Sequence, residues 1–315
     1  SDGSLIKFAA QIGIITNIEL DHPDHYTTLN EVIDTFKTFA EQCQTLVTCL
    51  DCPTIREQIY EGRTALQQST ISYSIQANSD ADYTVDCVNY RWNGTTAQVW
   101  EHDQCLGQLN LKLLGQHNLS NALAAVAVGR LLNLDFPTIA RALAGFEGAQ
   151  RRFEHCGVFN NILFIDDYAH HPSEIRATLA AARLQLDGSQ ANYGSRKRLV
   201  AVFQPHRYSR TLTFLSEFSQ VLASADTVVI TDIYSAGEPD LGQVSSKQLT
   251  ALIAAQHPDV HYQSSLQAVT NFLKTRLVPG DLVIFLGAGN LNQIISEVMA
   301  FHRSAEEGTQ EVAAS

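Results

Sequence analysis

Residues 164–172 read Phe-Ile-Asp-Asp-Tyr-Ala-His-His-Pro, an apolar strand end that runs directly into two acids, a phenol and two imidazoles. Proline suits the first turn of a helix, so Pro172 predicts the start of the next helix. Polar groups at the point where a strand gives way to a helix are typical of ligand sites in open α/β sheets. This stretch therefore predicts an α/β fold with a ligand site at the carboxyl end of a strand.

A second stretch of the same kind lies at residues 203–210, which read Phe-Gln-Pro-His-Arg-Tyr-Ser-Arg. Its His206 comes with Arg207 and Arg210, and two guanidiniums suit bidentate docking of a carboxylate or a phosphate. Helix capping or ordinary surface charge explains either stretch alone. The two together favour one crevice that both strand ends face.

Strands and helices alternate around these two stretches. The apolar runs predict strands at 162–165, 199–203, 228–233, 260–262 and 282–286, with helices from residues 172, 211, 245, 266 and 291. Continuous apolar runs are typical of parallel strands that are covered on both faces. We expect a doubly wound domain over residues 151–303 and a frayed polar tail over 304–315.

The first 150 residues predict a separate mixed α/β domain. Apolar or alternating runs indicate strands at 12–18, 46–50, 71–75, 83–88, 98–102 and 109–113, and helices at 29–43, 118–134 and 137–146. A total length of 315 residues fits two domains of ordinary size.

Composition excludes several classes of protein. The formal net charge of −12 argues against nucleic acid as a partner, because phosphate backbones select basic surfaces. The longest apolar runs are strand-sized, so we expect no membrane span, and no signal peptide pattern occurs. Cys49 and Cys52 form a CxxC motif without a second pair. We interpret them as two ordinary thiols in a reducing cytoplasm rather than as a redox site or half of a zinc site. The sequence specifies no oligomeric state.

Two segments of the first domain are candidates for binding. Residues 16–25 read Thr-Asn-Ile-Glu-Leu-Asp-His-Pro-Asp-His, where carboxylates suit Mg²⁺ and His22 could join them; a polar surface turn is the alternative. Residues 115–122 read Gly-Gln-His-Asn-Leu-Ser-Asn-Ala and open a helix. Asn118 and Asn121 share a face of that helix, and their carboxamides suit the edge of a purine. Simple N-capping by Asn118 is the alternative.

Two further segments lie at the domain boundary and after the last strand. Arg151 and Arg152 sit at the expected hinge, where a guanidinium could reach a nucleotide phosphate or could remain a solvated surface charge. Residues 287–290, Gly-Ala-Gly-Asn, lack the third glycine of a dinucleotide loop. We interpret them as a tight turn whose amides line the same crevice. No GxxxxGK[ST] motif occurs in the chain.

Taken in order, these motifs resemble the Mur ligase family, the ATP-dependent amide-bond ligases of peptidoglycan synthesis. The resemblance extends over nearly the whole chain and rests on residues 16–22, 115–121, 151–153, 166–172 and 203–210. The last of these favours the alanine-adding branch over the branch that recycles murein tripeptide. The implied architecture is a partial central ATPase domain at 1–150, followed by a Rossmann-like C-terminal domain. Because the chain starts Ser-Asp-Gly-Ser without Met, we expect the phosphate loop and a UDP-sugar domain upstream, and an inactive fragment without them.

The resemblance also implies substrates and residue roles. UDP-N-acetylmuramate and L-alanine would be joined through an acyl phosphate in the bacterial cytoplasm, with ATP and Mg²⁺. His22 would help to hold Mg²⁺, while His117, Asn118, Asn121, Arg152 and Asp167 would contact the nucleotide. The muramoyl carboxylate and the incoming alanine would meet Tyr168, His170, His206, Arg207 and Arg210, of which His170 and the two arginines would be catalytic. A non-catalytic nucleotide-binding module on the same scaffold is the alternative outside enzymes.

Overall fold

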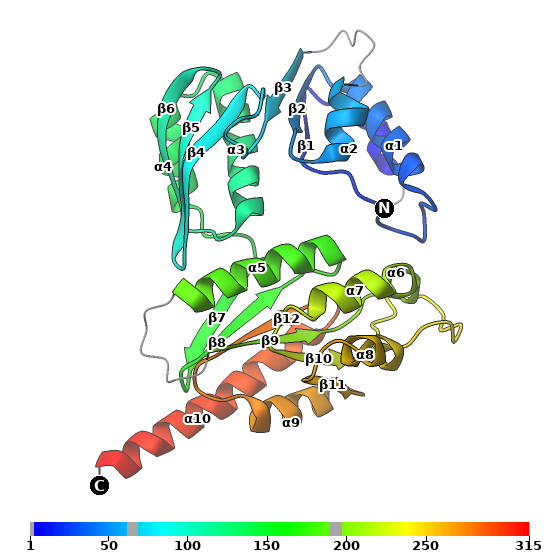
Figure 1. Cartoon of the computed structure of the whole chain (residues 1–315), viewed down its shortest axis with the longest axis vertical. Coiled ribbons are helices and arrows are strands. Elements are labelled where there is room, and N and C mark those ends of the chain that lie inside the picture. Colours follow the sequence, from blue (N-terminus) through cyan, green and yellow to red (C-terminus); the bar gives the residue numbers. More distant parts are fainter. Residues whose placement is uncertain (1–2, 62–68, 189–196, 315) are drawn as a thin grey trace. The chain divides into compact units, whose positions relative to one another are not determined.

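The computed structural model describes residues 3–61, 69–188 and 197–314 (Figure 1). It contains two compact units, residues 1–147 (unit 1) and 148–315 (unit 2), which divide close to the predicted boundary. The functional roles predicted for these two domains stay predictions. Among the helices in the described ranges, none has the length and apolar character to cross a membrane.

Unit 1 contains a six-stranded sheet in the order β1-β2-β3-β4-β5-β6. The first four strands pair in parallel, and β4, β5 and β6 form an antiparallel meander. The strands are β1 (Ile12–Ile15), β2 (Thr45–Cys49), β3 (Ser69–Tyr73), β4 (Tyr83–Arg91), β5 (Gly94–Glu101) and β6 (Gln104–Leu111). Each corresponds to a strand predicted from the sequence, which confirms the mixed α/β character of this half.

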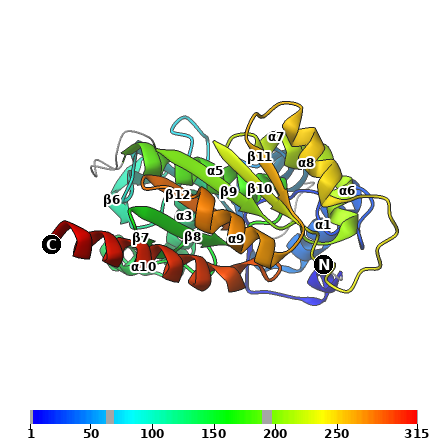
Figure 2. The same ribbon diagram turned by 90° about the horizontal axis from the view of Figure 1, so that it is seen from below.

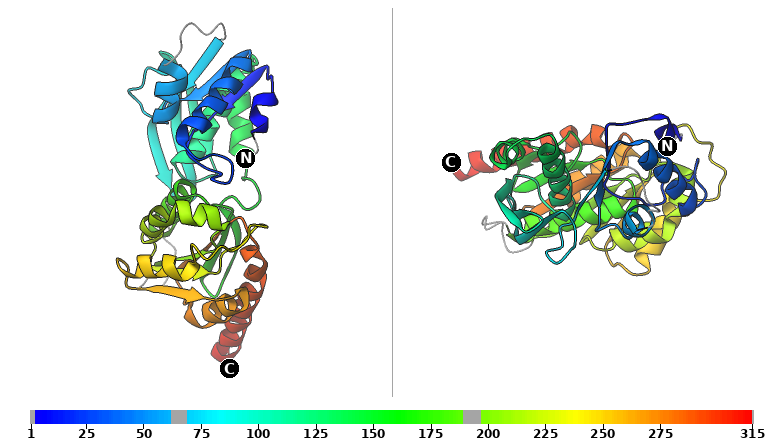
Figure 3. Two further views of the ribbon diagram at one scale, coloured as in Figure 1. Left: turned by 90° about the vertical axis from the view of Figure 1, so that its right-hand side faces the viewer. Right: turned by 90° about the horizontal axis from the view of Figure 1, so that it is seen from above.

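Side-chain caps start helices α1 (Leu29–Gln42) and α4 (Phe136–Gly145) of unit 1. The other helices described in this unit are η1 (Ser4–Lys7), α2 (Pro53–Ile55), the π-helical η2 (Arg56–Glu61) and α3 (Gln116–Leu131). A capping box between Thr28 and Glu31 starts α1, and the Asp135 side chain caps α4. Helix α3 packs on β2, β3 and β4, while α4 packs on β6 (Figure 3). These contacts bury a single apolar core in unit 1.

Unit 2 contains a second six-stranded sheet in the order β11-β10-β9-β12-β8-β7. Five strands are parallel, as predicted: β8 (Ile162–Asp167), β9 (Arg198–Phe203), β10 (Thr227–Thr231), β11 (Val260–Gln263) and β12 (Asp281–Leu286). The sixth, β7 (Glu154–Phe159), runs antiparallel to β8 at the edge of the sheet and was not predicted.

Helices cover both faces of this sheet, which confirms the doubly wound fold. They are α5 (Pro172–Gly188), α6 (Tyr208–Thr213), α7 (Leu215–Leu222), α8 (Ser246–Ala254), α9 (Leu266–Arg276), η3 (Leu291–Ile294) and α10 (Ile295–Ala314). Helices α5, α7 and α8 pack side by side on one face, and α9 and α10 pack on the other (Figures 1 and 2). The apolar strands are buried between these two helical layers.

The C-terminal tail differs from the expectation that residues 304–315 are frayed. Helix α10 continues to Ala314. His302 is only 3% exposed and its ring lies 6.2 Å from that of Phe164. The Asn160 amide donates to Glu306 Oε2 at 3.0 Å, so a buried side chain and a hydrogen bond attach this helix to the sheet beyond residue 301.

Strand β12 lies between the two strands whose ends were expected to face one crevice. Leu286 of β12 pairs with Asp167 of β8 on one side and with Phe203 of β9 on the other. The three strands therefore end at the same level, and the polar segments after β8 and β9 are separated by the loop that follows β12.

Candidate active site

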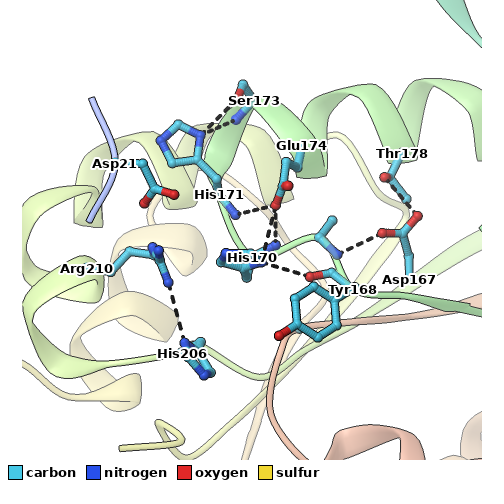
Figure 4. Close-up of polar contacts among 12 residues, drawn as sticks. Asp21, Asp167, Tyr168, His170, His171, Ser173, Glu174, Thr178, His206 and Arg210 are labelled. Atoms are coloured by element: carbon cyan, nitrogen blue, oxygen red, sulfur yellow. Dashed lines mark hydrogen bonds and ion pairs between the residues drawn. The ribbon is translucent and has the colours of Figure 1, made fainter. Parts of the chain in front are cut away.

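The structure brings His170 and His206 together above the end of β12. Their ring centroids are 5.9 Å apart, although one residue follows β8 and the other follows β9 (Figure 4). Tyr168 lies edge-on to His170 at 5.4 Å, and Tyr234 stacks on His206 at 5.6 Å. The predicted meeting of the two polar segments is thus present within unit 2.

Two glycines after β12 allow the segments that follow β9 and β10 to pack closely against the β12 loop. A Cβ on Gly287 would lie 2.7 Å from the Gln204 carbonyl oxygen, and one on Gly289 would lie 2.9 Å from Tyr234 Cβ. A side chain on Gly287 would clash with the segment after β9, and one on Gly289 would clash with Tyr234 after β10. The Gly287 amide donates to the Asp167 carbonyl, and the amides of Asn290 and Leu291 donate to Gln204 Oε1. Within this loop, the amides of Gly287 and Asn290 therefore bond to other parts of unit 2, and the expectation that the loop amides line the crevice stays a prediction.

His170 is held at the start of α5 by Glu174. Glu174 Oε2 accepts hydrogen bonds from the backbone amides of His170 and His171 at 3.0 and 3.2 Å, and it lies 3.3 Å from His170 Nδ1. The Tyr168 carbonyl oxygen is 2.9 Å from the same Nδ1 (Figure 4). Both oxygens are acceptors, so Nδ1 bears a hydrogen and the basic lone pair of neutral His170 is on Nε2.

Glu174 also forms an ion pair with Arg152, in which Arg152 Nη1 lies 3.3 Å from Glu174 Oε1. Burial opposes ionisation of Glu174, but His170 and Arg152 outweigh it and lower the pKa of the carboxyl. Arg152, Glu174 and His170 therefore form a chain of polar contacts along the start of α5.

His206 is neutral and has a defined tautomer. Arg210 Nη1 lies 3.4 Å from His206 Nδ1, and a guanidinium only donates, so Nδ1 accepts and Nε2 bears the hydrogen. Burial, the imidazole of His170 and the charges of Arg210 and Arg207 lower the pKa of His206 to about 4. The cluster thus presents an imidazole N–H donor beside guanidiniums, an arrangement that suits an anion.

The two adjacent arginines of the boundary have different environments. Arg151 Nε pairs with Asp166 at 3.1 Å, and Arg151 Nη2 donates to the Gly287 carbonyl at 2.8 Å. Its side chain is 23% exposed, whereas that of Arg152 is 51% exposed. This difference favours Arg152 as the residue for a ligand, although its predicted contact with nucleotide stays a prediction.

The Asp167 carboxylate accepts hydrogen bonds from residues of unit 2. Its Oδ1 accepts from the Ala169 amide at 2.7 Å, and its Oδ2 accepts from the Phe153 amide at 2.9 Å and from the Thr178 hydroxyl at 3.2 Å (Figure 4). Burial raises the pKa of this carboxyl. Asp167 therefore fixes the turn that presents Tyr168 and His170, and its predicted approach to the nucleotide stays a prediction.

In unit 1, the three residues predicted for adenine lie in the first two turns of α3. Gly115 is the N-cap, so the alternative in which Asn118 caps the helix is wrong. Asn118 Nδ2 instead donates to the Leu114 carbonyl at 2.8 Å, which fixes the orientation of the amide. Asn121 is exposed, and His117 is partly buried in the same helical turn as Asn118.

His22 lies between two carboxylates in the loop after β1. Its Nε2 is 3.6 Å from Asp21 Oδ2, and its Nδ1 is 3.9 Å from Asp24 Oδ1. No cluster of three or more His, Cys, Asp or Glu side chains that could hold a metal occurs within residues 3–61, 69–188 and 197–314. Mg²⁺ needs few protein ligands beside water and phosphate, so this oxygen-rich loop fits it, and the Mg²⁺ site stays a prediction.

Sequence reasoning missed Glu174, Tyr234 and Glu238. Glu174 had a readable signal, because it is the third residue of a helix that begins at Pro172, a position where glutamate bonds back to the preceding amides. Tyr234 and Glu238 lie in the irregular connection between β10 and α8, which has no periodicity to indicate what they contact.

Two family models match the chain. The Mur ligase middle domain matches residues 2–129, and the model described as Mur ligase, glutamate ligase domain matches residues 151–289.

Curated relatives and a solved structure agree with these matches. A UDP-N-acetylmuramate--L-alanine ligase from Nostoc sp. is 61% identical over 299 residues, which cover 95% of this chain and 59% of the relative. A protein of the same name from Cyanothece sp. is 61% identical over 96% of this chain and 62% of its own length. The chain thus spans about three-fifths of these relatives. The crystal structure of the UDP-N-acetylmuramate-alanine ligase from Thermotoga maritima matches with a TM-score of 0.76 at 23% identity, over 96% of this chain and 62% of that one.

Proposed function

Because this chain belongs to the Mur ligase family, we propose that the natural protein containing it joins L-alanine to UDP-N-acetylmuramate with ATP in the bacterial cytoplasm. The names of its relatives support this reaction. The observation that best supports the site is the cluster of Arg207, Arg210 and neutral His206, with His170 5.9 Å from His206. Such a cluster suits a small carboxylate beside a group that must lose a proton.

The proposed chemistry has two steps. A carboxylate oxygen of the muramoyl group attacks the γ-phosphorus of ATP, the bond to ADP breaks, and an acyl phosphate forms. The amine of L-alanine then attacks the acyl carbon, phosphate leaves, and the nitrogen gives up a proton. Cationic side chains would stabilise the negative charge that develops on the phosphoryl and acyl oxygens.

The residues of unit 2 would serve the second step. Arg207 and Arg210 would dock the carboxylate of L-alanine, and the His206 Nε2–H would donate to the same group. Tyr168 would flank the substrate beside His170. His170 Nε2 would receive the proton from the attacking nitrogen, because Glu174 and the Tyr168 carbonyl keep the hydrogen on Nδ1.

The residues of unit 1 would serve the nucleotide. Asn118 and Asn121 would contact the adenine edge with His117 beside them. His22 with Asp21 would help to hold Mg²⁺, which when bound would neutralise phosphate charge.

A substrate-dependence assay on the full-length natural protein tests the proposal. We expect ADP and phosphate only when UDP-N-acetylmuramate and L-alanine are both present. Phosphate release that requires a murein tripeptide in place of L-alanine would contradict the proposal and indicate the recycling reaction. Tight ATP binding without any turnover would indicate a non-catalytic module.

A further inference from the structure

The loop between β10 and α8 reaches back to the segment that contains Arg207. Glu238 in this loop accepts from the Ser209 hydroxyl through Oε1 at 2.7 Å and from the Ser209 amide through Oε2 at 3.0 Å. Its Oε1 also lies 3.6 Å from Arg207 Nη1, and the Glu238 side chain is 17% exposed. One carboxylate therefore contacts the first turn of α6 and the guanidinium that precedes it.

The same loop also fixes the backbone of Arg207. The Arg207 amide donates to the Tyr234 carbonyl, and the Tyr234 amide donates to the Pro205 carbonyl, both at 2.8 Å. Arg207 has a φ of 70°, a conformation that a non-glycine residue adopts only when its surroundings hold it. The loop thus determines both where the backbone of Arg207 lies and where its guanidinium points.

We propose that Glu238 is a positioning residue that orients the Arg207 guanidinium toward the carboxylate of the amino-acid substrate. This inference rests on the function proposed above. The two Ser209 hydrogen bonds fix the carboxylate, so its charge is presented to Arg207 from a defined direction. At 3.6 Å the ion pair is longer than a direct hydrogen bond, so Glu238 acts on the guanidinium through its charge.

The variant Glu238→Gln separates this role from helix capping. Its amide oxygen can still accept from the Ser209 amide and its NH2 group can donate to the Ser209 hydroxyl, but the negative charge that faces Arg207 is lost. The matched control is Asp240→Asn in the same loop, because Asp240 Oδ1 accepts only from the Gly242 amide among the bonds of the described chain. Both variants remove one negative charge.

Steady-state kinetics of the full-length natural protein give the readout. For Glu238→Gln we expect the KM for L-alanine to rise about tenfold, with kcat within about twofold and the KM for ATP unchanged. Asp240→Asn should match the wild type in all three constants. A KM for L-alanine in Glu238→Gln equal to that of Asp240→Asn would overturn the inference.

Two further measurements keep the test decisive. Glu238→Asp should recover part of the lost affinity, and in an Arg207→Ala background Glu238→Gln should have almost no additional effect, because the two residues act as a unit. Additive effects of the two substitutions would overturn the inference. If the wild type itself shows no turnover that depends on L-alanine, the proposed function fails, whereas normal wild-type turnover with an unaffected Glu238→Gln refutes only the role of Glu238.

Discussion

The two ends of the parallel sheet in unit 2 both collect charged side chains, but they hold them differently. At the amino ends of the strands, the ion pairs are short: Arg198–Asp281 at 2.6 Å, Arg183–Asp226 at 2.8 Å and Arg276–Asp259 at 3.0 Å. At the carboxyl ends, Arg152 lies 3.3 Å from Glu174, Arg207 lies 3.6 Å from Glu238 and Arg210 lies 3.4 Å from His206, while Arg151 pairs with Asp166 at 3.1 Å.

The two ends differ in the groups that surround these charges. The amino-end acids also accept backbone and hydroxyl hydrogen bonds, such as those from the Leu199 amide to Asp226 and from Thr227 to Asp259. At the carboxyl end, burial, the imidazole of His170 and the charges of Arg210 and Arg207 lower the pKa of His206 to about 4, an arrangement that favours a bound anion. A perturbed charge cluster at the ligand edge of a doubly wound sheet therefore indicates function, and a saturated one at the opposite edge indicates stability.

The largest expected effect is on stability, from Arg198→Ala at the amino end. The Asp281 side chain is 0% exposed, so this substitution leaves a buried carboxylate without its cation and should cost about 3–5 kcal/mol in the free energy of unfolding. Chemical denaturation measures it. Turnover per folded molecule at low temperature should be unchanged, and a loss of turnover without a loss of stability would contradict the division between the two ends.

Arg207→Ala at the carboxyl end should show the opposite pattern. Its side chain is 29% exposed and its ion pair is long, so we expect a loss of less than about 1 kcal/mol in stability. Amide formation should fall about 100-fold, because a donor to the substrate is lost. Arg210→Lys should be impaired as well, since lysine lacks the planar fork of donors. A fall in melting temperature without a fall in activity would show that these arginines are structural.

Glu174→Gln should lower kcat/KM about tenfold, because a neutral amide oxygen accepts from His170 Nδ1 more weakly than a carboxylate does and no longer neutralises Arg152. The same glutamine can still accept from the backbone amides, so the melting temperature should change little. Glu217→Gln is the matched control, because Glu217 is an exposed glutamate in the first turn of α7. Equal kinetics for both variants would remove Glu174 from the site.

The smallest effects are titrations, and they should differ between the two ends. His206 has a pKa of about 4 against an ordinary value of 6.5, so its neutral form is favoured in the fold and the protein loses stability as the pH falls from about 6.5 to about 4. Removing the cation in Arg210→Met should raise this pKa, as imidazole NMR would show. A titration of His206 near 6.5 in the wild type would contradict the cationic environment.

At the amino end, burial raises the pKa of Asp259, but Thr227, His261 and Arg276 outweigh it and lower the value to about 2. Its contribution to stability is present above about pH 3.8 and is lost as the pH falls toward 2. Asp259→Asn should therefore flatten the acid limb of the stability curve in that range. An unchanged acid limb would show that the carboxylate is not stabilised by its neighbours.

The sequence predicted the parallel strands of unit 2 because each is a continuous apolar run that ends in polar residues. It missed β7, whose sequence Glu-His-Cys-Gly-Val-Phe has no such run and contains a bulge near Gly157. An antiparallel edge strand with exposed residues leaves little hydrophobic pattern to detect. The position of β12 between β8 and β9 was also missed, because pairing between distant segments leaves no local signal.

The sequence predicted individual residues of the candidate site, but it did not predict the hydrogen bonds and ion pairs between them. His170, His206, Arg207 and Arg210 were predicted because they directly follow strands, and their roles stay predictions. Glu174 and Glu238, which orient them, were missed because carboxylates on helices and irregular loops are usually exposed, and only the fold shows which guanidinium they face. Gly289 was recognised as part of a turn, but its close approach to Tyr234 depends on a strand that is distant in sequence.

The central claim is that the carboxyl end of this sheet binds the amino-acid substrate. A crystal structure of the full-length natural protein with ADP and UDP-N-acetylmuramoyl-L-alanine tests it directly. We predict that the alanyl carboxylate lies about 3 Å from the guanidiniums of Arg207 and Arg210, with His206 Nε2 donating to it. An alanyl group bound elsewhere, with Arg207 still on Glu238 and Arg210 still on His206, would contradict the account.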